Sequence, residues 1–336
     1  MNDWKSKLIA DQTTWLLEED NPSVRYFTLI DLLEKSKEDP EVLKVKAEIM
    51  QKGVIPKILA KQKKEGYWEE AEKFYTAKYK GTVWQILILA QLGADGKDSR
   101  IKRACEFLFK NSQERENSGF SISVSAKTKF GGGRSSVVIP CLTGNLVYSL
   151  IKLGYLEDER VQKAIHWITT YQRFDDGIEE RPKGPYDRYP MCWGKHTCHM
   201  GAVKALKALA EIPLEQRNEE VKNTISRGVE YLLQHHLYKK SHDLSKVAKP
   251  GWLRLGFPLM YQDDILEILG ILTQLGYHDQ RMQEAMDKLI SKQDKEGKWK
   301  LENTFNGRFQ TNIEQKGKPS KWITLNALKV IKKYYS

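Results

Sequence analysis

Two kinds of helical pattern alternate along the chain. In the first kind apolar residues occupy most positions, which is typical of a helix buried on nearly every side. In the second kind apolar residues recur at every third or fourth position, as at Ile101, Ala104, Cys105 and Leu108, which indicates one buried face. The apolar kind is expected over residues 83–92, 141–153, 200–209, 259–275 and 322–334. The amphipathic kind is expected over residues 101–111, 161–171, 221–236 and 282–292.

The alternation repeats with a period of roughly 60 residues. Leu-Gly pairs begin at residues 92, 153 and 275, so the gaps of 61 and 122 are one period and two. An imperfect copy covers residues 205–236, and a further pair covers residues 24–33 and 41–60. About six inner and six outer helices predict an all-α fold, an (α/α)6 toroid, with an open solenoid as the alternative. Residues 1–336 would form one domain, in which residues 1–53 are a less typical HEAT-like helical pair that closes the ring.

The connections between these helices differ in length. Inner helices are joined to outer ones by short turns, whereas outer helices return to inner ones through residues 114–139, 175–196, 238–258 and 296–319. Long loops without regular structure are uncommon unless they have a function. In a ring of hairpins they would share one face, at the N-termini of the inner helices, where the helix dipoles are positive. We therefore expect the functional site on that face.

Two segments match the pattern Q-x3-G-x-W. They contain Gln62, Gly66 and Trp68, and then Gln293, Gly297 and Trp299. The pattern resembles the QW repeat of the squalene cyclase, terpenoid cyclase and protein prenyltransferase superfamily, in particular a prenyltransferase- and squalene-oxidase-repeat-like branch. The resemblance implies an α/α toroid with a central aromatic-lined cavity and an isoprenoid-handling activity. We expect the motif residues themselves to be structural: the glutamine would bind carbonyls at a helix C-terminus, and the indole would pack between neighbours.

The chemistry of that superfamily is matched only in part. Class II cyclases carry a D-x-D-D acid, and here Gln262-Asp263-Asp264 lacks the first aspartate. Asp263 to Glu267 also reads D-D-x-x-E, which is similar to the magnesium-binding motif of class I terpene synthases. Acids at the start of a helix also cap its amides. Asp263 and Asp264 are therefore candidate catalytic residues, magnesium is less expected than zinc, and transfer or binding is more expected than cyclisation.

Three cysteines and a histidine fall on the same predicted face. They are Cys141, Cys192, Cys198 and His199. Thiolate and imidazole ligands are those that zinc prefers, and fragments around Cys192 and Cys198 resemble the zinc motifs of lanthionine cyclases, which are also toroids. We expect these four residues as a zinc site, with Cys198 and His199 as catalytic candidates. The alternative is that the cysteines are small buried packing residues.

Basic and aromatic residues in the long loops are candidates for substrate binding. Arg134 follows a glycine-rich stretch, residues 129–136, whose amides resemble a phosphate cradle without matching a Walker loop. Asp175, Asp176 and Glu179 offer a carboxylate pair of the kind used by sugar-cleaving enzymes on similar barrels. The full set expected to bind substrate is Arg134, Tyr189, Trp193, Lys195, Trp252, Arg254 and Tyr261.

Composition adds three limits. The 336 residues carry 55 Lys and Arg against 44 Asp and Glu, a net charge of +11, which favours an anionic partner. No apolar run reaches the roughly 20 residues of a membrane helix, and no signal peptide is evident. Four cysteines are too few for a disulfide framework, so we expect a reducing, cytoplasmic location.

Three functions remain open at this level. The leading one is an isoprenoid-handling enzyme that binds an apolar molecule with an anionic head, such as a prenyl diphosphate. The second is a zinc-dependent lyase, hydrolase or thiol-modifying enzyme. The third is a toroid without catalytic activity that binds a peptide or a polyanion; no nucleic-acid-binding motif is present. The sequence leaves catalysis and oligomeric state undecided.

Overall fold

The computed structural model describes residues 4–125, 132–180 and 190–336. Within them the chain is mostly helical, with a small two-stranded antiparallel sheet. None of the described helices is both long and apolar enough to cross a membrane.

The helices fall into an inner and an outer set. The inner set comprises α2 (Pro22–Phe27), which continues as a π-helical turn, η2 (Thr28–Leu32), and then α5 (Thr82–Gln91), α7 (Pro140–Lys152), α10 (His199–Ala210), α12 (Ile265–Gln274) and α14 (Lys321–Tyr335). The outer set comprises α3 (Pro40–Ile49), α4 (Val54–Leu59), α6 (Ser99–Asn111), α8 (Glu159–Tyr171), α11 (Glu219–Gln234) and α13 (Gln283–Ile290). Shorter elements are η1 (Trp4–Lys7), α1 (Thr13–Leu16), α9 (Pro190–Trp193), β1 (Lys239–Lys240), β2 (Asp243–Val247) and η6 (Pro250–Leu253).

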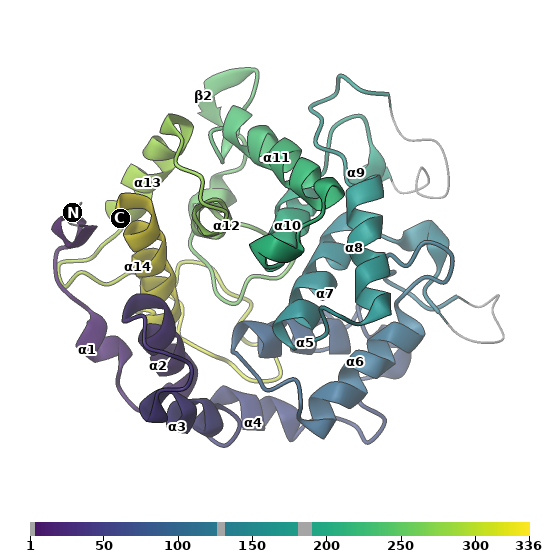
Figure 1. Ribbon diagram of the computed structural model, residues 1–336, viewed down its shortest axis with the longest axis horizontal. Coiled ribbons are helices and arrows are strands. Elements are labelled where there is room, and N and C mark those ends of the chain that lie inside the picture. Colours follow the sequence, from purple (N-terminus) through teal and green to yellow (C-terminus); the bar gives the residue numbers. More distant parts are fainter. Residues whose placement is uncertain (1–3, 126–131, 181–189) are drawn as a thin grey trace.

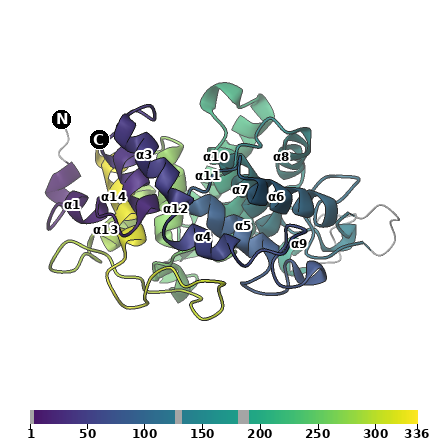
Figure 2. The ribbon, with the colours of Figure 1, turned by 90° about the horizontal axis from the view of Figure 1, so that it is seen from below.

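The inner helices follow one another around a common centre. In chain order α5 packs on α7, α7 on α10, α10 on α12 and α12 on α14, and α14 returns to α2 and η2. Figure 1 shows this course, with the two ends of the chain side by side. In Figure 2 the long segment before α14 lies on one side of the helices. The arrangement is compatible with the expected ring of helical hairpins.

Burial follows the sequence pattern. In α7 every residue from Pro140 to Leu150 is buried, whereas α6 buries one face through Ile101, Ala104, Cys105 and Leu108. Four of the outer helices, α3, α6, α8 and α11, begin at side chains that accept a backbone N–H, such as Asp98 before α6. Such caps stabilise a helix start by about 1 kcal/mol.

One expected helix boundary is wrong, and the structure adds a short hairpin. Helix α12 begins at Ile265 instead of residue 259, because the carboxylate of Asp264 accepts the N–H of Glu267 and fixes the first turn there. The carbonyls of Leu259 and Met260 instead accept side-chain amides of α5 and α7. The hairpin of β1 and β2 was not expected, since strands of two and five residues are too short to leave an alternating pattern.

The tryptophans of the repeated motif hold the ends of outer helices. Trp68 and Trp299 are fully buried. Trp68 Nε1 donates to the carbonyl of Ile58 at 2.9 Å, and Trp299 Nε1 donates to that of Leu289 at 2.7 Å. The indoles thus bind orphan carbonyls at these helix ends. The glutamine of the second motif does so as well, as the sequence suggested, since Gln293 Nε2 donates to the carbonyl of Ile290 at 3.2 Å.

The glutamines join neighbouring repeats. Gln62 Nε2 donates to the carbonyl of Arg100 at 2.9 Å, and Gln113 Nε2 donates to that of Arg160 at 2.8 Å. Each acceptor lies in the first turn of the next outer helix. The glutamine therefore fixes the position of one hairpin relative to the next.

The last glutamine joins the two ends of the chain. Gln293 Nε2 donates to the carbonyl of Lys7, and Gln293 Oε1 accepts the N–H of Ile9, both at 2.9 Å. Gln12 Nε2 donates to the carbonyl of Glu296. Gly297, with a φ of 79°, stands so close to Ala10 that a Cβ there would lie 2.8 Å from its backbone nitrogen. The N-terminal segment therefore takes the place that the next repeat occupies elsewhere.

Replacing Gln293 by alanine should loosen this joint. We expect a loss of about 1 kcal/mol in the free energy of unfolding, because two hydrogen bonds at an exposed site are lost. Urea denaturation measures the loss, and hydrogen exchange should become faster in residues 5–12. Gln62→Ala is the matched control, since it breaks the same joint between two internal repeats. Equal exchange in residues 5–12 for the wild type and both variants would contradict this role.

Candidate functional site

A cavity of about 420 Å³ lies among the inner helices. Residues of α2 with η2, α5, α7, α10, α12 and α14 all contribute to its wall. Pockets for small molecules are typically of about 300–1,000 Å³. This cavity is therefore the first candidate for a ligand site in the described part of the chain.

One end of the cavity is apolar. Phe257 and Leu259, from the segment before α12, and Trp322, from the start of α14, line it. The rings of Phe257 and Trp322 are stacked, with centroids 4.5 Å apart and planes 10° apart. A stacked aromatic pair presents a flat apolar surface, so this end suits the apolar part of a ligand.

The other end of the cavity lies at the C-termini of the inner helices and is charged. Lys329 pairs with Asp31 at 2.5 Å, and Lys152 pairs with Glu211 at 3.3 Å. Lys333 also lines the cavity, and no ion pair holds it within the described residues. Desolvation at the cavity edge, together with Lys329, lowers the pKa of Lys333. An anion bound beside Lys333 would therefore stabilise its charged form.

Two lysines of α10 share one carboxylate in the cavity wall. Glu267 of α12 accepts from Lys204, and it accepts from Lys207 at 2.9 Å. The Lys207 ammonium also stands 4.3 Å from the centre of the Tyr148 ring. Burial raises the pKa of Glu267, but the two lysines outweigh that effect and lower it. Lys207, Glu267 and Tyr148 face the cavity, so its wall combines a cation, an anion and a phenol. We call the cations Lys152, Lys207, Lys329 and Lys333 the lysine wall.

The two aspartates before α12 have different surroundings. Asp264 lines the cavity, and its oxygens accept the N–H groups of Glu267 at 2.9 Å and Gly256 at 2.8 Å. Burial nevertheless raises the pKa of Asp264 to about 7. Asp263 is fully buried, and neither of its oxygens has a hydrogen-bond partner among the described residues. Burial raises the pKa of Asp263 to about 8, so its carboxyl group is protonated at neutral pH.

His199, at the start of α10, lies beside Asp263. His199 Nε2 is 3.7 Å from Asp263 Oδ2, and the indole of Trp252 meets the imidazole edge to face at 3.9 Å. Both ring nitrogens of His199 are buried without a hydrogen-bond partner in the described structure. Burial, and then the neighbouring His235, lower the pKa of His199 to about 3. A protonated carboxyl beside a neutral imidazole is a pair between which a proton can move.

The cysteines do not form the expected zinc site with His199. Cys192 donates to Cys198, which lowers the pKa of Cys198 and raises that of Cys192. Burial raises the pKa of Cys141 to about 12. His199 faces Asp263, and no group of three or more His, Cys, Asp or Glu side chains within the described residues is arranged to hold a metal. The residues as placed do not fit a zinc or magnesium centre, and both metals stay predictions.

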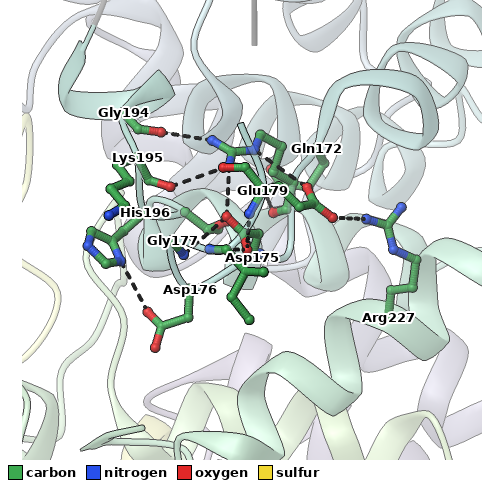
Figure 3. A network of polar contacts seen from close by, with 12 residues as sticks. Gln172, Asp175, Asp176, Gly177, Glu179, Gly194, Lys195, His196 and Arg227 are labelled. Carbon is green, nitrogen blue, oxygen red and sulfur yellow. Dashed lines mark hydrogen bonds and ion pairs between the residues drawn. The ribbon is translucent and has the colours of Figure 1, made fainter. Parts of the chain in front are cut away.

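The loop between α8 and α9 is organised by a buried carboxylate (Figure 3). Asp175 accepts the N–H groups of Ile178 and Glu179 and the guanidinium of Arg173, which in turn donates to the carbonyl of Gly194 at 2.8 Å. Burial raises the pKa of Asp175, but these donors outweigh it and the pKa is lowered. Asp175 is thus fully engaged in shaping the loop. This engagement argues against the carboxylate pair suggested by the sequence.

The remaining predicted residues are dispersed. Arg134, Lys195 and Arg254 are exposed on loops and do not line the cavity. Trp193 is buried, and its Nε1 donates to the carbonyl of Val138 at 3.3 Å. Tyr189 and residues 129–131 of the glycine-rich stretch lie outside the described residues. The structure therefore brings Asp263, His199, Trp252 and Cys198 together and leaves the basic residues apart.

Sequence reasoning missed the charged cavity wall. Lys204 and Lys207 interrupt the otherwise apolar α10, and Glu267 interrupts α12. A charge in a helix that is apolar on all sides has to be buried and paired, which marks a polar site inside the fold. The charged residues in these apolar helices were visible in the sequence, whereas the pairing of the three residues could be seen only in the structure.

Comparisons with known proteins leave the family open. The chain matches no protein-family model and no curated protein. Among solved structures, it is similar to a protein from Actinoplanes, 12% identical, with 87% of this chain and 100% of that chain aligned and a TM-score of 0.31. It is also similar to a variant of the type II terpene cyclase MstE from Scytonema in complex with merosterolic acid A, 12% identical over 87% of this chain and 96% of that chain, with a TM-score of 0.30. Likeness at this level establishes neither a shared fold nor a shared activity.

The burial of Asp263 predicts a specific pH dependence of stability. Its folded-state pKa of about 8 lies above the ordinary aspartate pKa of 3.8. The free energy of unfolding therefore falls as pH rises from about 4 to about 8. As pH rises across that window, the free energy of unfolding of Asp263→Asn should therefore increase relative to that of the wild type. Below and above the window, the difference between the two proteins should not change with pH. Denaturant titrations at several pH values measure the difference.

Asp175→Asn is the control of opposite sign. The pKa of Asp175 is lowered in the folded state, so its contribution to stability is present above about pH 4 and is lost as pH falls. This variant should be destabilised at neutral pH and less so in acid. A pH-independent difference between Asp263→Asn and wild type would show that Asp263 is not held protonated.

Proposed function

We propose that the inner and outer helices form a closed α/α toroid whose central cavity binds a small molecule with an apolar body and an anionic head, and that the protein is an isoprenoid-handling enzyme of the terpenoid cyclase-like kind. The observation that carries the proposal is the division of the cavity, with stacked aromatic rings at one end and the lysine wall toward the other. The isoprenoid class comes from the Q-x3-G-x-W resemblance.

The orientation of the ligand follows from this division. The apolar body would lie against Phe257 and Trp322, and the head would lie at Lys207 and Lys333. This places the head near the C-termini of the inner helices, the opposite end from the one expected from the long loops. Helix dipoles disfavour an anion there, so the lysines have to supply the attraction.

The apolar end of the cavity also supplies an acid. Asp264 faces the cavity with a pKa near 7, so a large fraction carries a proton at neutral pH. Transfer of that proton to an alkene carbon of the ligand would form a C–H bond, break the alkene π bond and leave a carbocation on the ligand, which is then captured by another alkene of the same ligand or loses a proton. Asp264 would be left as a carboxylate already held by the N–H groups of Gly256 and Glu267. Asp263 and His199, directly behind, would hold the next proton. A positioned acid of matched pKa typically contributes about 10²–10⁴-fold to a rate.

Binding to the cavity can be tested by filling it. Gly270 lines the cavity in the middle of α12, and a Cβ there would meet Val330 at an ordinary 3.7 Å. Gly270→Leu should therefore fold and block geranyl diphosphate binding, measured by calorimetry. Gly270→Ala is the matched control, which should keep binding and gain up to about 1 kcal/mol of stability.

The head-group part of the same test uses Lys333 and a ligand without a head. Geraniol should bind at least tenfold more weakly than geranyl diphosphate, and Lys333→Gln should weaken only the latter, by about tenfold, since a hydrogen bond to a charged group contributes about 1.5–3 kcal/mol. Equal affinity of Gly270→Leu and wild type would place the ligand outside the cavity and refute the proposal.

If Asp264 is the acid, its replacement should abolish product formation without weakening ligand binding. Asp264→Asn retains a side-chain oxygen for the N–H of Glu267 but has no acidic proton. Incubation with a polyprenyl alkene, followed by gas chromatography and mass spectrometry, should give a product with the wild type and at least 100-fold less with Asp264→Asn. Unchanged product formation by the variant, or no product from the wild type, would exclude Asp264 as the acid.

A further inference from the structure

Three loops meet at the N-terminal end of the inner helices, away from the lysine wall. They carry Lys78 and Tyr79 before α5, Tyr261 before α12 and Arg308 before α14. The N–H of Tyr79 donates to the carbonyl of Arg308 at 3.2 Å, and the Arg308 guanidinium approaches the carbonyl of Lys78 at 3.5 Å. These contacts bring two cations from distant parts of the sequence to one place. None of these four residues lines the central cavity.

Aromatic rings hold both cations. The Lys78 ammonium stands 4.5 Å from the centre of the Tyr261 ring and 5.0 Å from that of Tyr75. The Arg308 guanidinium stands 5.1 Å from the centre of the Tyr79 ring. Rings hold a cation through their π faces without neutralising its charge. Burial, and to a smaller extent the nearby Arg308, lower the pKa of Lys78.

No carboxylate balances this pair within the described residues. Neither Lys78 nor Arg308 takes part in an ion pair there, whereas many other lysines and arginines of the described structure do. Two like charges held close together without an anion raise the free energy of the protein, and an anion that binds there lowers it. The cluster is thus poised for a negatively charged ligand.

A chain of hydroxyl groups adds a neutral donor. Gln262 Nε2 donates to the Tyr79 hydroxyl at 3.3 Å, and the Tyr79 hydroxyl donates to that of Tyr261 at 3.2 Å. The Tyr261 O–H is then left as the last donor of the chain. Tyr261 is half-buried. Three donors therefore converge: an ammonium, a guanidinium and a phenol.

We propose that Lys78, Arg308 and Tyr261 form a binding site for a phosphoryl group, separate from the central cavity. Two cations and one neutral donor match a dianion with three acceptor oxygens better than they match a carboxylate, which has one charge and two oxygens. The buried Tyr79 ring packs at a tilt against the half-buried Phe305, with centroids 4.0 Å apart. The Phe305 ring beside the donors can therefore carry the organic part of a phosphate monoester.

Calorimetry with inorganic phosphate, phenyl phosphate and acetate tests the site. The wild type should bind both phosphates at least tenfold more tightly than acetate. Arg308→Gln and Lys78→Gln should each weaken phosphate binding by about tenfold or more, and Tyr261→Phe should weaken it severalfold with an unchanged melting temperature. Tighter binding of phenyl phosphate than of phosphate would identify an organic ester as the ligand, and equal binding would identify the free ion; both support the site.

Two controls separate this site from others. Lys249→Gln removes another cation that stands over an aromatic ring, that of Trp252 at 5.6 Å, and should leave phosphate binding unchanged. Lys298→Gln removes a cation that stands over the Trp15 ring at 4.7 Å and should also leave phosphate binding unchanged. Arg308→Gln should bind geraniol as the wild type does, so this site and the cavity can fail independently. The proposal is overturned if wild type does not bind phosphate, or if Lys249→Gln or Lys298→Gln weakens binding as much as Arg308→Gln does.

Discussion

The arrangement of the helices depends on one kind of contact, the hydrogen bond from a motif glutamine to the start of the next hairpin. Gln62 and Gln113 make it between internal repeats, and Gln293 makes it to Lys7 and Ile9 of the N-terminal segment. Each of these bonds joins a glutamine side chain to backbone that is distant from it in the sequence. The last of these bonds joins the two ends of the chain, which is compatible with the proposed closed ring of hairpins, and residues from each of the inner helices line one cavity.

That constraint also explains where the polar groups lie. Inner helices are buried on almost all sides, so a charged residue on them must face either a partner or the cavity. Lys204 and Lys207 share Glu267 as their partner, and Lys207 also faces the cavity. The segment before α12 has the same double role: Asp264 caps the helix and faces the cavity, while Asp263 is directed toward His199. The raised pKa values of both aspartates follow from this burial.

Much of the fold could be predicted from the sequence, and less of the site. The period of roughly 60 residues and the contrast between apolar and amphipathic segments located the helices within a few residues, because burial and periodicity are local properties. The start of α12 was wrong, since the cap at Asp264 overrode an apolar pattern that continues back to residue 259. The closeness of Asp263 and His199 could not be read from residues 64 positions apart. Three of the expected zinc ligands, Cys192, Cys198 and His199, are near one another along the chain, but Cys141 is distant from them and His199 turns toward the carboxylate. The segments before α5, α12 and α14 meet at one end of the inner helices, yet the lysine wall lies at the other.

The central claim is that the cavity among the inner helices is the ligand site. A crystal structure of the protein with geranyl diphosphate tests it most directly. The account predicts density for the prenyl chain against Phe257 and Trp322 and for the diphosphate at Lys207 and Lys333. Density for the ligand at any other place, with only water among the inner helices, would contradict it.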